Sequence, residues 1–251
     1  MPFSLKRYIP NTLTLTNLLC GCFAIFSLFM DRTNLVLPFI IIAMFADFFD
    51  GMIARLLNVK TPIGKDLDSL ADVVSFGVVP AFLMIYLVVL THPINNTNNF
   101  IDELKSIYSL KTYLVIFFPL IIALFSALRL AKFNISTNQS SEFKGLATPA
   151  CSVFVLGLFH NYISGNEYFN FIYTPLILNI ISLILALLLV SNIPMFSFKV
   201  GSLSIKENPF QIIFILLGII LLMMFNLSGL PLIVLLYIIL NLVKNIIKDE
   251  I

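Results

Sequence analysis

The stretch ADFFDGMIARLLNVKTPIGKDLDSLAD, residues 46–72, places acidic residues inside segments that are otherwise strongly apolar. An ionised carboxylate at bilayer depth costs about 3 kcal/mol or more. Such residues are therefore rare in membrane helices and usually functional. The carboxylates of this stretch need a partner that compensates their charge.

The composition around this stretch is that of a membrane protein. The chain has 251 residues, of which 59% are hydrophobic and 11% charged, and its mean hydropathy is +1.02. Apolar runs recur along the whole length with short polar connections, so residues 1–251 are predicted to form a single membrane domain. The basic residues stand singly at the ends of apolar runs, and we therefore expect no nucleic-acid partner.

Apolar windows of about 20 residues, the length that spans the hydrocarbon core, predict the helices. We expect an all-α, polytopic integral membrane helical bundle with a core over about residues 9–190 and two additional C-terminal helices over about residues 210–247. The eight predicted transmembrane helices are residues 12–30, 34–56, 69–90, 112–131, 147–164, 171–190, 210–226 and 230–247.

The basic residues predict the orientation of this bundle. With both termini in the cytoplasm, three of the 15 Lys and Arg residues fall outside, and the positive-inside rule is obeyed. The outside residues are Arg32, Lys105 and Lys111. The inside residues are Lys6, Arg7, Arg55, Lys60, Lys65, Arg129, Lys132, Lys144, Lys199, Lys206, Lys244 and Lys248.

Two sets of residues share helix faces near the predicted cytoplasmic interface. The first set, separated by three, one and three residues, is Asp47, Asp50, Gly51 and Ala54. Asp68 and Asp72 are four residues apart on the following helix. The small side chains leave the backbone open to a large ligand, and four carboxylates across a cleft are the ligands that Mg²⁺ or Mn²⁺ prefers.

Two alternatives to a metal site stay open from the spacing alone. Acidic residues at a membrane edge can simply face the interface, as is expected for Asp66. Intramembrane carboxylates also occur in ion or proton transporters. A transporter is disfavoured because the cluster lies near one interface and the chain shows no inverted repeat.

The motif reads Asp47-x-x-Asp50-Gly51-x-x-Ala54-Arg55, eight residues, then Gly64-x-x-x-Asp68-x-x-x-Asp72. At every motif position it resembles the signature of the CDP-alcohol phosphotransferases, membrane enzymes that move a phospho-alcohol from a CDP donor to a hydroxyl. IPNTLTLTNLLCGCFAI, DSLADVVSFGVVPA, SALRLAKFN and FKGLATPA further resemble the serine-using branch of that family. Lys132 and Ala147 depart from that branch, in which Arg and Pro are frequent at these positions.

The resemblance implies transfer of a phosphatidyl group from CDP-diacylglycerol to L-serine, with release of CMP. Glycerol 3-phosphate or inositol phosphate stay open as alternative acceptors. The resemblance also implies a homodimer, and an active site on the cytoplasmic side of the cell (inner) membrane, where the acyl chains of the donor lipid stay in the bilayer.

The resemblance assigns roles to the motif residues. It implies Mg²⁺ or Mn²⁺ on Asp47, Asp50, Asp68 and Asp72, with Asp72 also acting as the general base. The donor site would be Asp47, Asp50, Gly51, Ala54, Arg55, Gly64 and Asp68.

The carboxylate of serine needs a cation, and three cations lie at the end of the fourth window and in the loop beyond it, on the same side. The candidate serine-binding residues are Arg129, Lys132, Asn134, Lys144 and Thr148. Arg129 is the best placed because it lies inside the apolar run. Lys132 and Lys144 are explained equally well as positive-inside anchors.

Overall fold

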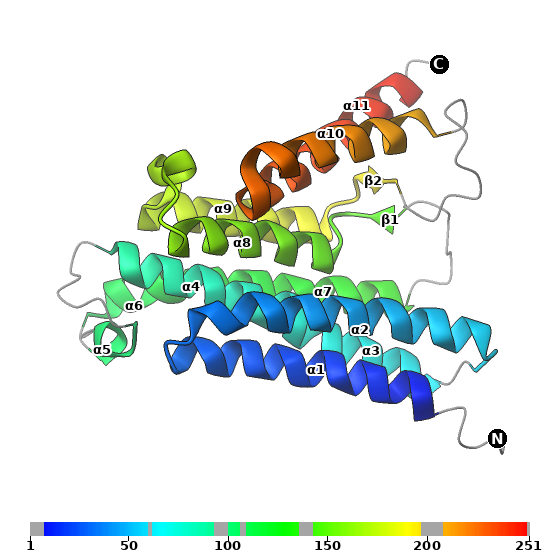
Figure 1. Ribbon diagram of the computed structural model, residues 1–251, viewed down its shortest axis with the longest axis horizontal. Helices are drawn as coiled ribbons and strands as arrows, with labels where there is room; N and C mark the ends of the chain where they lie inside the picture. Colours follow the sequence, from blue (N-terminus) through cyan, green and yellow to red (C-terminus); the bar gives the residue numbers. More distant parts are fainter. Residues whose placement is uncertain are drawn as a thin grey trace.

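The apolar windows form long helices that lie side by side in the computed structural model of the chain (Figure 1). The structure describes residues 8–59, 62–92, 100–105, 109–135, 143–196 and 208–249. The N-terminal helices are α1 (Tyr8–Phe29), α2 (Val36–Leu56), α3 (Pro62–Val73), α4 (Val79–Thr91), α5 (Phe100–Lys105), α6 (Leu110–Phe117) and α7 (Ile121–Ile135). The remaining elements are β1 (Phe143–Lys144), α8 (Thr148–Ile163), α9 (Pro175–Val190), β2 (Pro194–Met195), α10 (Pro209–Phe225) and α11 (Leu230–Asp249).

Helices α3 and α4 form one continuous helical rod, and so do helices α6 and α7. A turn of π-helix, Val74–Val78, connects α3 to α4, and a 3-10 turn, Phe118–Leu120, connects α6 to α7. Each of the eight predicted windows therefore falls on a helical rod within the described residues.

Five helical stretches of the described residues are long and apolar enough to cross a membrane. They are Tyr8–Phe29, Thr33–Leu56, Ile63–Thr91, Leu110–Ile135 and Pro209–Ile247. The last stretch holds both α10 and α11, which turn at Asn226, where φ is +51°. The predicted polytopic membrane bundle is confirmed. Eight crossings and two cytoplasmic termini stay predictions, although α1 begins and α11 ends at the same end of the bundle (Figure 1).

The helix boundaries differ from the apolar windows at two prolines. The third rod begins at Pro62, before the window 69–90, because its first turns are polar and Pro suits the first position of a helix. Asp68 and Asp72 therefore lie well inside a helix. The sixth rod begins at Pro175, after a 3-10 segment, Glu167–Ile172, that occupies the start of the window 171–190.

The rod that carries Asp68 and Asp72 runs through the centre of the bundle. Residues 83–89 of α4 are almost completely buried, since this helix is apolar on every side and neighbouring helices cover it. This burial fixes the rod in place, and with it the acidic turns at its start.

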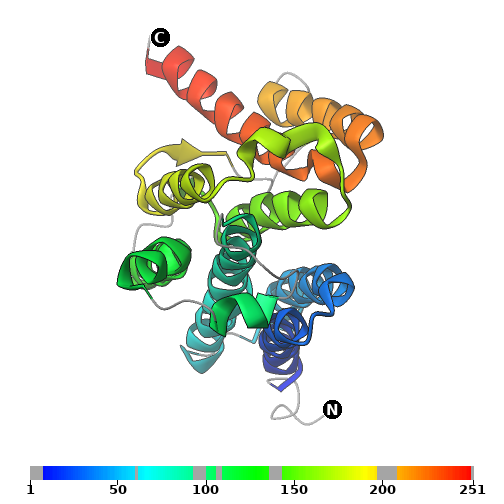
Figure 2. The same ribbon diagram turned by 90° about the vertical axis from the view of Figure 1, so that its left-hand side faces the viewer.

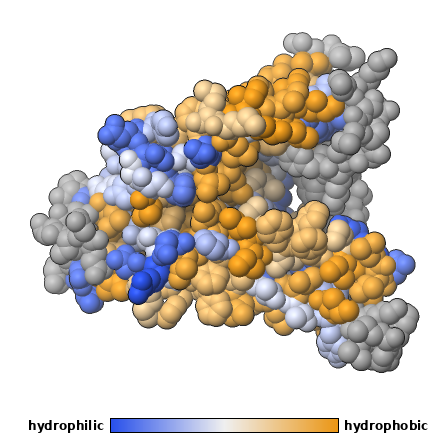
Figure 3. All heavy atoms as spheres, viewed as in Figure 1, coloured by the Kyte–Doolittle hydropathy of each residue, from blue (hydrophilic) through white to orange (hydrophobic). Residues whose placement is uncertain are grey.

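The C-terminal hairpin of α10 and α11 lies beyond α8 and α9, on the side of the bundle away from α1 and α2 (Figure 2). Apolar side chains cover the middle of the face shown in Figure 3, while polar side chains gather toward its ends. This distribution matches a bundle whose middle lies in lipid.

Candidate active site

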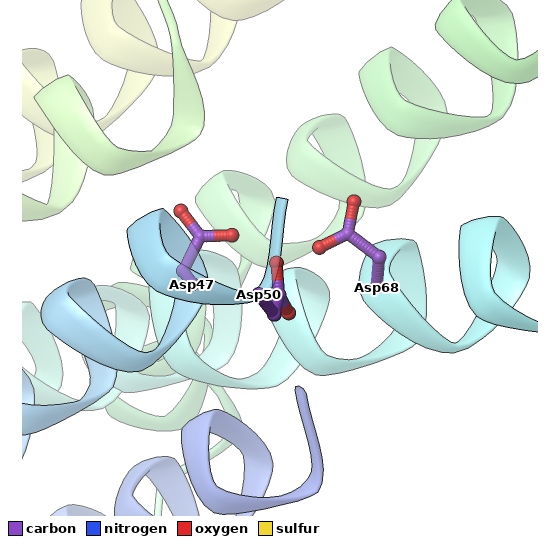
Figure 4. Close-up of side chains that lie close together, drawn as sticks. All are labelled: Asp47, Asp50 and Asp68. Carbon is purple, nitrogen blue, oxygen red and sulfur yellow. The ribbon is translucent and has the colours of Figure 1, made fainter. Parts of the chain in front are cut away.

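Three carboxylates converge from α2 and α3. Oxygen atoms of Asp47, Asp50 and Asp68 all lie within 4.8 Å of one another. Asp47 and Asp68 point toward each other across the space between the helices, and Asp50 lies between them (Figure 4). The structure thus brings together three of the four aspartates whose convergence the spacing predicts.

The chemistry of this cluster fits a divalent cation. The one ion pair among the described residues joins Lys105 to Asp102, so no lysine or arginine of the described chain is bonded to the three carboxylates. Three like charges this close together, with Asp50 only 5% exposed, are strongly unfavourable without a counterion. Oxygen-only ligands from two helices are the donor set that hard divalent ions take.

Helix α1 supports the cluster by packing against both α2 and α3. The Thr14 hydroxyl donates a hydrogen bond to Asp50 Oδ2 over 2.5 Å, and both residues are buried. This contact orients the Asp50 carboxylate within the cluster.

We expect Thr14→Val to weaken the affinity for Mn²⁺ by about 10- to 100-fold, because loss of an outer-shell hydrogen bond frees the ligand to rotate. Calorimetric titration of the purified protein with Mn²⁺ measures this change. Thr12→Val is the matched control, since the Thr12 hydroxyl donates to Tyr8 O on the exposed face of the same helix. Equal affinities for Thr14→Val and wild type would contradict the role given to this contact.

The fourth aspartate, Asp72, occupies a separate position beside the cluster. Its carboxyl interacts with that of Asp47, and its Oδ1 accepts a hydrogen bond from Asn17 Nδ2 over 3.3 Å. Asn17 is fully buried, and its backbone oxygen accepts a hydrogen bond from the Ser75 hydroxyl over 2.9 Å. Asp72 is therefore oriented by α1 and by the π-helical turn that follows it, a feature frequent at functional sites.

Close packing between α1 and the π-helical turn makes this arrangement possible. Gly21 lies directly against Ser75, and a methyl group at Gly21 would overlap with that side chain. The close approach of the two helices brings Asn17, one turn earlier on α1, within reach of Asp72.

The predicted donor-binding residues line the C-terminal half of α2 and the start of α3. A Cβ added at Gly51 would meet nothing within 4 Å, so there is free space at the helix surface beside Asp50. Ala54 and Gly64 are half-buried, and Arg55 is exposed in the last turn of α2. Small residues thus leave this surface uncovered beside the carboxylates, and Arg55 places a cation at its edge.

Arg129 of α7 lies within electrostatic range of the acidic site. Its charge interacts with that of Asp72, and it also lies close to Cys151 of α8. Its buried Nε has no hydrogen-bond partner among the described residues. Thr148, one turn before Cys151, likewise has a buried hydroxyl without a partner there. Unpaired buried polar groups are costly, which indicates that this region binds a polar ligand or water.

The other three candidates for serine binding lie elsewhere. The Asn134 side chain donates to Ser69 Oγ over 2.8 Å, and its backbone oxygen accepts from Lys65 Nζ over 2.9 Å, so it ties α7 to α3. Lys132 and Lys144 are exposed.

Four residues near the site did not follow from the motif. They are Thr14, Asn17, Ser152 and Tyr237. Thr14 and Asn17 carried a readable signal, since two polar residues one turn apart in an apolar helix share a face and require partners. Ser152, whose buried hydroxyl is unpaired among the described residues, shares a face of α8 with Thr148.

Comparisons with known proteins identify the family to which this bundle of membrane helices belongs. The chain belongs to the CDP-alcohol phosphatidyltransferase family, whose sequence profile matches residues 7–190. It is 35% identical over 193 residues to the CDP-diacylglycerol–serine O-phosphatidyltransferase of Bacillus subtilis, an alignment that covers 77% of this chain and 92% of the relative. The protein of the same name from Helicobacter pylori is 30% identical over 222 residues, covering 86% of this chain and 83% of the relative. A third, from Methanocaldococcus jannaschii, is 30% identical over 193 residues, covering 76% of each chain.

Proposed function

We propose that this integral membrane protein transfers a phosphatidyl group from CDP-diacylglycerol to L-serine, giving phosphatidylserine and CMP. The observation that carries the proposal is the convergence of Asp47, Asp50 and Asp68 beside Asp72. Clustered carboxylates do not stabilise a bundle of membrane helices, whereas binding of a diphosphate donor requires a divalent cation that such carboxylates can hold. The names of the relatives support serine as the acceptor.

The three clustered aspartates would hold Mg²⁺ or Mn²⁺. When bound, the cation neutralises the diphosphate oxygens of the donor and the charge that develops on the leaving CMP. The open surface at Gly51 would receive the nucleotide, with Ala54 and Gly64 leaving room for it. Arg55, in the last turn of α2, would contact a phosphate oxygen.

Asp72 would act as the base toward serine. The serine hydroxyl oxygen attacks the phosphorus that carries the diacylglycerol, the bond from that phosphorus to CMP breaks, and Asp72 takes the hydroxyl proton. The hydrogen bond from Asn17 holds the Asp72 carboxylate in one orientation. Helix α1 packs against both helices that carry the four aspartates, so their relative positions are fixed before substrate binds.

Arg129 and Thr148 would recognise the acceptor. Both have buried polar atoms that lack a partner among the described residues, and the charge of Arg129 lies close to Asp72. The guanidinium would bind the carboxylate of serine and leave its hydroxyl directed toward Asp72. Lys132 and Lys144 would contribute attraction from the cytoplasmic surface, and Asn134 would fix α7 against α3.

An acceptor panel tests the proposal. Purified protein is given CDP-diacylglycerol and Mn²⁺ with serine, glycerol 3-phosphate or inositol phosphate, and CMP release is followed. We expect rapid release with serine alone among the three. Release with glycerol 3-phosphate or inositol phosphate instead would assign another acceptor within the family, and ion transport without CMP release would refute the proposed reaction.

We expect Arg129→Ala to raise the KM for serine by about 10- to 100-fold while changing the KM for CDP-diacylglycerol much less, because a charged partner of the acceptor is lost. Steady-state kinetics with each substrate varied in turn measures the two effects. Lys132→Ala serves as comparison, because Lys132 is the exposed cation one turn further along α7. An unchanged KM for serine in this variant would indicate that Lys132 only anchors the helix at the membrane surface. An equal loss toward both substrates in Arg129→Ala would contradict its role in acceptor binding.

We place the active site on the cytoplasmic side of the cell membrane, as the distribution of Lys and Arg predicts. Asp66 and Glu167 are both exposed, the first near the carboxylate cluster and the second in the segment before α9. In a background without the native cysteines, Asp66→Cys and Glu167→Cys should react with an impermeant maleimide from opposite sides. Labelling of both from one side would contradict the topology.

We further propose a homodimer, which rests on the resemblance to the family. Light scattering of the purified protein, corrected for detergent, should give a protein mass of two chains.

A further inference from the structure

A short segment after α9 joins the C-terminal helices to the beginning of α8. In this segment, β2 pairs with β1 in an antiparallel register that sets Met195 opposite Phe143 and Pro194 opposite Lys144. Backbone hydrogen bonds extend this contact, because Gly145 N donates to Ile193 O over 2.9 Å and Leu146 N donates to Leu188 O over 2.9 Å. Residues 143–146 therefore lie fixed against the end of α9 and the chain that follows it.

Gly145 shows how tight this connection is. Its φ of +73° is a conformation that side chains disfavour, and a Cβ there would lie 2.7 Å from Leu189 O and 2.8 Å from Ser191 O. The chain then enters α8 at Thr148, three residues later. The strand pairing thus determines where Thr148, with its buried hydroxyl, lies relative to Arg129.

Helix α11 holds the other side of the same segment. Asn241 Oδ1 accepts a hydrogen bond from Phe196 N over 2.6 Å, and the Tyr237 hydroxyl donates to Phe196 O over 3.0 Å. Asn245 Nδ2 donates to Pro194 O over 3.0 Å. Asn241 is fully buried, and its Nδ2 also donates to Tyr237 O over 2.7 Å, which fixes the amide. The contacts form one largely buried network, in which each bond orients the next.

Tyr237 also lies in the neighbourhood of Arg129. Arg129 and Tyr237 are close enough to interact electrostatically. The family profile matches residues 7–190, so α11 lies outside the matched part of the chain. A helix beyond that core thus contacts both the segment that places Thr148 and the neighbourhood of Arg129.

We propose that α11 is a positioning element for the acceptor site, and that Tyr237 and Asn241 act through β2 and β1 on the residues that enter α8. The inference rests on the proposed function, because it assigns the acceptor to Arg129 and Thr148. Tyr237 and Asn241 do not touch the reacting atoms; they determine how well the serine pocket is formed.

The test compares three variants of the full chain in lipid nanodiscs. Tyr237→Phe removes only the hydroxyl that binds Phe196 O, and Asn241→Leu removes the amide at similar volume. Ser228→Ala is the control, since Ser228 is buried at the far end of the same hairpin and its Oγ accepts a hydrogen bond from Asn166 Nδ2 over 2.9 Å. Steady-state KM values for serine and CDP-diacylglycerol are measured together with hydrogen exchange of residues 143–148.

We expect Tyr237→Phe to raise the KM for serine by about five- to tenfold with an unchanged KM for the donor. Asn241→Leu should raise the KM for serine by a larger factor. Both variants should accelerate hydrogen exchange at the backbone amides of Gly145 and Leu146. Ser228→Ala should change neither quantity. Equal losses toward both substrates, or unchanged exchange and KM in Tyr237→Phe, would overturn the proposal. A wild-type protein that releases CMP only with another acceptor would instead refute serine as substrate. The hydrogen-exchange data would still test whether α11 holds residues 143–148 in place.

Discussion

Replacement of Asp72 by Asn should lower the rate of CMP release by about 100- to 10,000-fold, the usual contribution of a general base. The amide has nearly the same shape as the carboxylate but cannot take the proton of the serine hydroxyl. Asp72 lies beside the cluster of Asp47, Asp50 and Asp68 and is held separately by Asn17. Asp72→Asn should therefore keep more affinity for the CDP donor than Asp47→Asn does.

Donor binding by calorimetry and CMP release, measured on the same preparations, separate the two roles. Asp66→Asn is the matched control, because Asp66 lies on the same helix and is exposed. It should keep near wild-type activity. If Asp72→Asn turned over serine at the wild-type rate, or lost donor binding as completely as Asp47→Asn, its assignment as the base would be wrong.

Replacement of Asp50 by Asn should abolish most metal binding, with a loss of affinity for Mn²⁺ of at least about 100-fold, more than removal of an outer-shell contact costs. The same change should leave the metal-free protein as stable as the wild type or more stable. The physical reason is that removing one of three neighbouring charges relieves their repulsion, while the amide oxygen can still accept the hydrogen bond from Thr14.

Thermal unfolding with and without Mn²⁺ tests this pair of effects. Binding to the folded state alone raises the midpoint of wild-type unfolding, and Asp50→Asn should show almost no such rise. Asp31 is exposed and precedes α2, at the opposite end of that helix from the cluster, so Asp31→Asn should behave as the wild type does. An equal rise in Asp50→Asn and wild type would show that the cation binds elsewhere.

The carboxylate site followed from the sequence because helical geometry relates residues three or four apart. Asp47 and Asp50 had to share a face of one helix, and the short connection to Pro62 had to bring Asp68 back to the same level. The helical rods followed equally directly, because length and apolar character alone predict them.

The contacts that orient the site could not be predicted in this way. Thr14 and Asp50 are 36 residues apart, and Asn17 and Asp72 are 55 residues apart, so no helical period relates them. Both contacts depend on how α1 packs, and the packing near Asp72 depends on a π-helical turn that ordinary periodicity does not show. The network around Asn241 links parts of the chain 45 residues apart through backbone groups, which side-chain patterns do not reveal.

The most direct test follows both products of the proposed reaction at once. Purified protein in nanodiscs is given CDP-diacylglycerol, isotopically labelled serine and Mn²⁺, and lipid-bound label and free CMP are measured over time. We predict one CMP for each serine transferred to lipid, with neither product formed after EDTA treatment or by Asp68→Asn. CMP release without label in the lipid, or equal activity in Asp68→Asn, would contradict phosphatidyl transfer to serine at the aspartate cluster.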